Sequence, residues 1–183
     1  MKGKLILGLA VASFFSVSAM ASDYTYNDET YKIDIGKKNV KVSHCDKEKK
    51  CDDATADIGS LKSVLKKRIA EYEDLLSDQE GLLANVKKQV GSATDIIKDE
   101  QGGATYIMLS LGENFNLPIL EKDAKAGSFD LVFSAIEANV SRYQRVVDVL
   151  ESGKEPKGFS ATDYGKIAPV MEMHNIVKFA KYL

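Results

Sequence analysis

An apolar repeat in the middle of the chain constrains the fold more than any other feature. Every seventh residue of one seam between residues 69 and 97 is apolar. This seam consists of Ile69, Leu76, Leu83, Val90 and Ile97. A repeat of this spacing places apolar side chains along one face of a helix that packs against a partner. It predicts a single helix over residues 58–100, with at most a bend where Ser77-Asp78-Gln79-Glu80 resembles a capping box.

Two more segments with helical spacing follow. Residues 128–153 are expected to form a helix with Ser128 as its N-cap and Gly153 at its end. A further helix is expected from Ser160, with Pro169 either kinking it or marking its true start. The fold class expected from these segments is mainly α (α+β). Residues 55–183 would form an elongated antiparallel bundle of three or four helices.

The connection over residues 104–120 is unusually apolar for a loop between helices. One interpretation is a short helix that folds back onto the bundle and completes its core. The alternative is an exposed apolar tip that contacts a membrane or a partner protein. The residues that would make this contact are Tyr106, Ile107, Leu109, Leu111, Phe115 and Leu117. The segment has few basic residues, which disfavours the membrane version.

Residues 22–54 have the alternating pattern of β-strands. Tyr31, Ile33 and Ile35 alternate with polar residues, and Val40 and Val42 resume the alternation after a turn. We expect a small β-hairpin or meander of two or three strands that packs on the helices as an appendage. An exposed edge strand of this sheet could also recruit another chain by β-augmentation.

The two cysteines of the chain, Cys45 and Cys51, lie close together with five charged residues between them. In an oxidising compartment such a pair predicts a local disulfide bond. A metal site that also used His44 is the alternative, but the spacing matches no common zinc pattern. A redox-active pair would normally have the Cys-x-x-Cys spacing, which is absent.

Residues 1–21 resemble a signal peptide. Lys2 and Lys4 precede a short apolar run, and small residues follow, with cleavage expected after Ala21. The run is too short for a membrane-spanning helix. The expected location is the periplasm or the exterior of a Gram-negative bacterium.

Charge and motifs disfavour several functions. After residue 21 the chain has 23 basic and 27 acidic residues, so we expect no nucleic-acid partner. We find no nucleophile elbow, phosphate-binding loop or zinc-protease motif. Met171, Met173 and His174 could ligate haem or copper in principle, but helical methionines usually serve packing. We therefore expect no cofactor, no metal and no enzymatic activity.

These observations favour an exported binding or assembly protein without enzymatic activity. A chaperone-like bundle, a component of a secretion apparatus and an inhibitor of a toxin would each fit, and a protein partner is expected. The alternative is a secreted membrane-active helical protein that uses residues 104–120.

Overall fold

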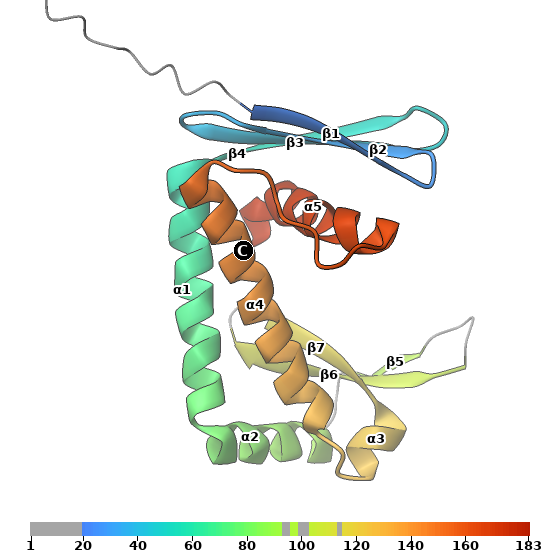
Figure 1. The fold of residues 1–183 in the computed structure, drawn as a ribbon. Helices are drawn as coiled ribbons and strands as arrows, with labels where there is room; N and C mark the ends of the chain where they lie inside the picture. The colour runs from blue at the N-terminus through green and yellow to red at the C-terminus, as the bar shows by residue number, and fades with distance from the viewer. Residues whose placement is uncertain (1–19, 93–95, 99–102, 113–114) are drawn as a thin grey trace, which may run out of the picture.

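The computed structural model describes residues 20–92, 96–98, 103–112 and 115–183. Nearly all of the expected signal peptide lies outside these ranges. The chain has an α+β fold with a four-stranded and a three-stranded antiparallel sheet. Two long helices run side by side from one sheet to the other (Figure 1). The expectation of a mainly α helical bundle is therefore wrong, because strands supply five of the 17 buried residues in one hydrophobic core of the described chain and five of the 12 in the other.

The first sheet is a meander of β1 (Met20–Tyr26), β2 (Glu29–Ile35), β3 (Asn39–Cys45) and β4 (Cys51–Asp57). The turn between β1 and β2 contains only Asn27 and Asp28, both with positive φ. This conformation suits the right-handed twist of a two-residue hairpin, and Asn and Asp tolerate it best after glycine. The sheet thus has one strand more than the largest number expected and extends beyond residue 54.

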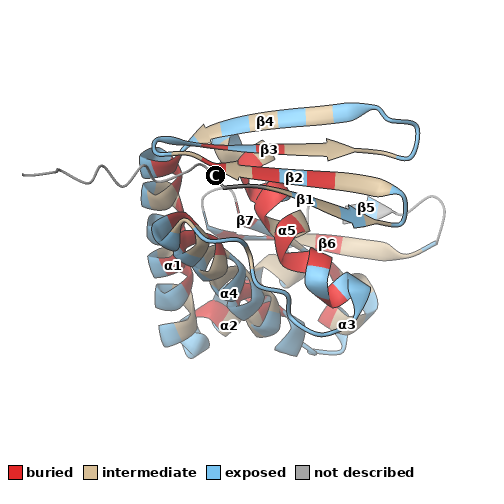
Figure 2. Cartoon of the chain, turned by 45° about the horizontal axis from the view of Figure 1, so that its top comes forward, coloured by how far each residue is buried: buried red, intermediate tan, exposed pale blue. Residues whose placement is uncertain are grey.

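One face of this sheet is buried, as the alternation predicts. Tyr31, Ile33, Ile35, Val40 and Val42 are all buried. They pack against α5 (Asp163–Lys178), which lies across the sheet (Figures 1 and 2). The sheet is therefore one wall of a core rather than an appendage.

The single helix expected over residues 58–100 is wrong. The structure has α1 (Ile58–Ser77) and α2 (Gln79–Gly91), which leaves in a different direction (Figure 1). The break lies at Asp78, whose carboxylate accepts a hydrogen bond of 2.9 Å from the backbone N–H of Gly81. A local N-cap of this kind competes with continuation of the helix. The helical face shifts with the break, so that Leu82 is buried and Leu83 is only partly buried.

The described residues of the segment 105–120 form strands rather than the short helix expected. β6 (Thr105–Gly112) pairs with β7 (Phe115–Leu120) and with the short β5 (Ile96–Lys98). Ile107, Leu109 and Leu111 alternate with more exposed residues, which is the period of a strand. Pro118 is tolerated because β7 is an edge strand of this sheet.

Two of the remaining helices lie near their expected positions, and the short helix that precedes them was not predicted. α3 (Glu121–Lys125) is short, and α4 (Asp130–Ser152) ends at Gly153, which adopts the left-handed conformation typical of a helix C-cap. α5 begins after Thr162, whose hydroxyl accepts a hydrogen bond from the N–H of Gly165. A 3-10 turn, η1 (Ala180–Tyr182), follows.

The interior is divided into two clusters, one beside each sheet. The upper lobe consists of β1–β4, α5 and the adjoining ends of α1 and α4. The lower lobe consists of β5–β7, α2, α3 and the other ends of α1 and α4. Tyr143 of α4 packs against both clusters, and its ring lies 5.9 Å from that of Tyr72 of α1, which in turn lies 4.6 Å from Phe115 between centroids.

Candidate functional site

The predicted disulfide bond between Cys45 and Cys51 is confirmed. The two residues face each other in the register of β3 and β4, at the end of the hairpin. The Asp46 carboxylate orders the short loop between them by accepting hydrogen bonds from the N–H groups of Glu48 and Lys50. The bridge therefore closes an exposed hairpin.

The side chains considered for membrane or partner contact lie mostly inside the lower lobe. Ile107, Leu109, Leu111 and Phe115 are buried, and Tyr106 and Leu117 are partly buried. All of them except Tyr106 belong to the cluster formed with α2, α3 and α4. Among the described residues of the segment, these side chains therefore form no exposed apolar tip.

Three of the four exposed aromatic side chains of the described residues gather elsewhere, in the upper lobe. Phe159, Tyr164 and Phe179 are 50%, 60% and 49% exposed. Together they surround a hollow of about 450 Å³ between α4 and α5, which we call the aromatic hollow. Its remaining lining residues are Arg142, Tyr143, Ala168, Met171, Glu172, Asn175 and Ile176.

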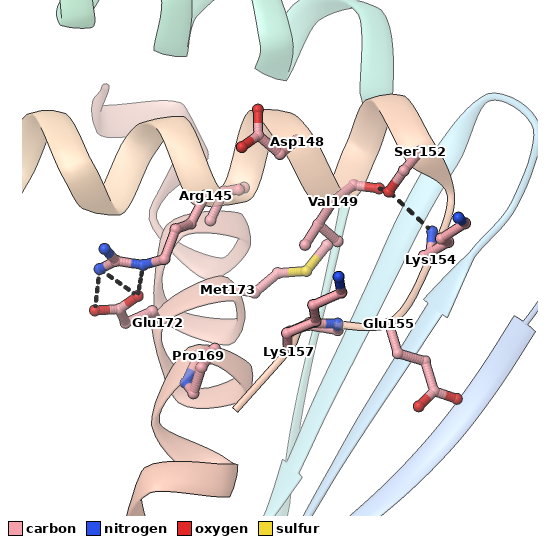
Figure 3. Close-up of a pocket in the computed structure, with 12 residues that line it drawn as sticks. Arg145, Asp148, Val149, Ser152, Lys154, Glu155, Lys157, Pro169, Glu172 and Met173 are labelled. Atoms are coloured by element: carbon pink, nitrogen blue, oxygen red, sulfur yellow. Dashed lines mark hydrogen bonds and ion pairs between the residues drawn. The ribbon is translucent and has the colours of Figure 1, made fainter. Parts of the chain in front are cut away.

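A second hollow of about 370 Å³ lies beside the first, and we call it the α4–α5 cleft. Its apolar lining includes Val149 of α4 and Met173 of α5, whose side chain points toward Val149 (Figure 3). The loop after α4 closes its far side with Lys154, Pro156 and Lys157. Volumes of this size accommodate one or two large side chains of a partner.

An ion pair separates the two hollows. The Arg145 guanidinium makes a bidentate contact with the Glu172 carboxylate, with two nitrogen–oxygen distances of 2.9 Å and one of 3.1 Å (Figure 3). Arg145 also lies over the ring of Phe159, 4.7 Å from its centroid. These contacts hold the guanidinium and the exposed ring in place, so this part of the surface is preorganised.

The loop after α4 and the C-terminal segment are locally basic. Residues 153–183 have five lysines and three acidic residues, whereas residues 22–152 have 18 basic and 24 acidic residues. The acidic groups that line the cleft already have partners: Glu172 pairs with arginine, Asp148 accepts from Gln144, and Glu155 accepts from Ser22. Lys154 and Lys157 are exposed and form no ion pair within the described part of the chain. The available charge at the rim is therefore positive.

The two histidines of the chain come together at a separate place, which the sequence did not indicate. His44 of β3 and His174 of α5 have ring centroids 5.7 Å apart. Burial holds the pKa of His174 below its ordinary value. Within the described ranges, no group of three or more His, Cys, Asp or Glu residues is arranged to hold a metal ion. The histidines face a tyrosine and an ion pair rather than a cavity.

The sequence did not indicate the aromatic hollow, because helical spacing after Ser160 places Tyr164 and Phe179 on the same side as apolar residues such as Ile167. A usable signal was nevertheless present, since Phe159 stands among Gly158, Ser160 and other loop-forming residues. A large aromatic side chain in such a loop is either covered by the fold or presented to a partner.

No family model, curated protein or solved structure matches this chain. Among the helices of the described residues, none has the length and apolar character needed to span a membrane.

Proposed function

We propose that the protein is an exported, non-enzymatic binding protein that docks a segment of a protein partner on the aromatic hollow and the α4–α5 cleft. The occupant is an acidic segment that carries one or two large apolar side chains. The observation that carries this proposal is the clustering of half-exposed Phe159, Tyr164 and Phe179 around one hollow.

The residue types at this surface support protein binding. Aromatic residues, methionine and arginine are enriched at the centres of protein interfaces and at their energetic hot spots. Here Met171 and Arg142 line the same hollow as the three aromatic rings. A monomeric protein gains nothing in stability from leaving such rings half exposed, so a binding role accounts for them best.

Charge complementarity supports an acidic partner. Lys154 and Lys157 stand at the rim without ion-pair partners among the described residues, while the nearby carboxylates are occupied. Acidic side chains on the partner would reach these ammonium groups while its apolar side chains enter the two hollows. Rim charges of this kind mainly raise the rate of association and select the partner.

The proposal of export rests on the N-terminal pattern of residues 1–21, and the disulfide bond is compatible with an oxidising compartment. The periplasm or the exterior of a Gram-negative bacterium remains the location we propose.

The binding proposal can be tested with synthetic peptides of ten residues. One peptide has glutamates around a central Phe and Leu, the second has lysines around the same pair, and the third has glutamates around two alanines. We expect the first to bind more tightly than the other two. Binding should weaken at least tenfold in a Phe159→Ala, Phe179→Ala double variant, because two hot-spot rings are lost.

The matched control is Leu131→Ala, which truncates a 61% exposed side chain of α4 in the lower lobe. It should bind as the wild type does. Equal binding of all three peptides, or an unchanged affinity in the double aromatic variant, would contradict the proposal.

A further inference from the structure

The interface between α5 and the four-stranded sheet contains a polar cluster built around both histidines of the chain. The ring of Tyr31 stacks on His44 with centroids 4.4 Å apart. The same Tyr31 ring meets His174 edge-on at 5.8 Å. A single tyrosine therefore contacts both imidazoles, one from the sheet and one from the helix.

The two histidines have different surroundings. The Nε2 atom of His44 lies 2.9 Å from a carboxylate oxygen of Glu29, and the side chain retains a quarter of its exposure. His174 is only 4% exposed, and its Nε2 atom has no hydrogen-bond partner in the described part of the protein. A neutral ring tolerates this position, whereas a charged ring would lose its hydration without gaining a carboxylate at that nitrogen.

The charged groups around His174 have opposite effects on its protonation. His44 of β3 and Lys178 of α5 disfavour a second positive charge, whereas Asp52 of β4 favours it. The Asp52 carboxylate already pairs with Lys178. β2 contributes Glu29, which is bound to His44. β1 places the uncharged residues Ser22, Tyr24 and Tyr26 on the same face, opposite Ile33, Tyr31 and Glu29.

We propose that the His44–His174 pair makes the docking of α5 on the sheet sensitive to pH, so that mild acid loosens α5 together with the aromatic hollow that it lines. A protonated His174 is accommodated better when it reaches water, which requires the C-terminal half of α5 to leave the sheet. Met171 of the hollow lies in the C-terminal half of α5 and Phe179 directly follows the helix, so both would move with it.

The direction of the effect follows from proton linkage. The pKa of His174 is lower in the folded protein than in the unfolded chain, where it is about 6.5. The unfolded or undocked state therefore binds more protons below pH 6.5, and stability is lost as the pH falls through this range. A single group changes the equilibrium constant by at most about tenfold per pH unit. The carboxylates Glu29 and Asp52, whose pKa values are lowered, respond only in more acidic solution.

The test is amide hydrogen exchange followed by NMR at pH 7.0 and pH 5.5, with each rate corrected for the intrinsic pH dependence of exchange. We expect α5 amides of the full-length mature protein to lose protection by several-fold at pH 5.5, while α1 amides in the lower lobe keep theirs. His174→Gln should remove this difference between the two pH values, because the buried imidazole of α5 is lost while His44 remains in place. Unchanged protection of α5, or the same loss in His174→Gln, would overturn the proposal.

A second variant keeps the test decisive if His174→Gln folds poorly. His44→Gln removes the neighbouring imidazole from a partly exposed position, and we expect it to fold and to show a smaller loss of α5 protection in acid. A loss of α5 protection equal to that of the wild type would exclude the histidine pair as the origin of the pH dependence. The change in α5 does not depend on the docking proposal. The expected effect on binding rests on the docking proposal, and it is measured separately with the acidic peptide at both pH values.

Discussion

The two lobes have similar architectures but differ in the kinds of side chains that they bring together. Each has an antiparallel sheet packed against helices, and α1 and α4 contribute to both. The upper lobe contains the disulfide bond, the histidine pair and the exposed aromatic rings. The lower lobe has a buried cluster made only of apolar and aromatic side chains.

In the lower lobe, a glutamine side chain also forms hydrogen bonds with the backbone of a strand. The side-chain amide of Gln89 in α2 accepts from the Ser110 N–H and donates to the Ser110 carbonyl, both at 2.8 Å. It thus pairs with β6 as a neighbouring strand would, close to the irregular register between Ser110 and Gly112. This difference fits our proposals, in which the lower lobe serves stability and the upper lobe carries binding and regulation.

The largest expected effect concerns the core of the lower lobe. Leu109 is fully buried, so Leu109→Asp places an unpaired charge among apolar side chains. We expect it to cost more than the roughly 2–5 kcal/mol typical of a buried Leu→Ala change and to unfold the protein. Circular dichroism during thermal melting measures this, with exposed Leu131→Asp as the control. A folded Leu109→Asp variant would contradict a structural role for the lower lobe.

A smaller effect tests the break between α1 and α2. Leu82 is buried and Leu83 only partly buried. Leu82→Ala should therefore reduce the free energy of unfolding by about 2–4 kcal/mol, and Leu83→Ala by less than half as much. Urea denaturation of both variants compares them directly. The reverse order would restore the continuous seven-residue seam and place Leu83 in the core.

The disulfide bond should affect only the upper lobe. The loop that it closes is short, with a sequence separation of 6, so a Cys45→Ser, Cys51→Ser variant should lose about 2 kcal/mol. Hydrogen exchange should show faster opening of β3 and β4, while the amides of β6 keep their protection. Equal loosening of both sheets would mean that the two lobes unfold as one unit.

The smallest effect concerns the cap of α2. Asp78→Ala should cost about 1 kcal/mol, because the Gly81 N–H loses its acceptor. A Cβ added at Gly81 would lie 2.1 Å from a carboxylate oxygen of Asp78. Gly81→Ala should therefore bring none of the usual gain in helix propensity, whereas the Asp78→Ala, Gly81→Ala double variant should recover stability. Additive effects of the two changes in thermal melting would contradict this geometry.

The accuracy of the sequence predictions also differed between the lobes. In the upper lobe, strict alternation from Tyr31 to Val42 predicted the buried face of the sheet, and the cysteine spacing predicted the bridge. In the lower lobe, the seven-residue repeat crossed a helix break that depends on one local contact of Asp78. Short apolar runs such as Tyr106–Leu111 do not distinguish strand from helix by composition, and the hairpin was missed for that reason.

The aromatic hollow could not be predicted because it depends on how α5 crosses the sheet. Spacing placed Tyr164 on the apolar side of a helix, but α5 buries a wide arc that includes Ile167, Val170 and Met173. Tyr164 lies outside that arc. The contact between His44 and His174 likewise joins residues 130 positions apart, which no local pattern reports.

The central claim is that the upper lobe binds an acidic, apolar segment on the surface formed by α4, α5 and the loop between them. An NMR titration of the ¹⁵N-labelled mature protein with the glutamate-rich Phe-Leu peptide tests it most directly. We predict shifts concentrated at Arg142, Phe159, Met171 and Phe179, which shrink at high salt, with Leu131 and the amides of β6 unchanged. Shifts centred on the lower lobe, or no shifts at millimolar peptide, would contradict the account.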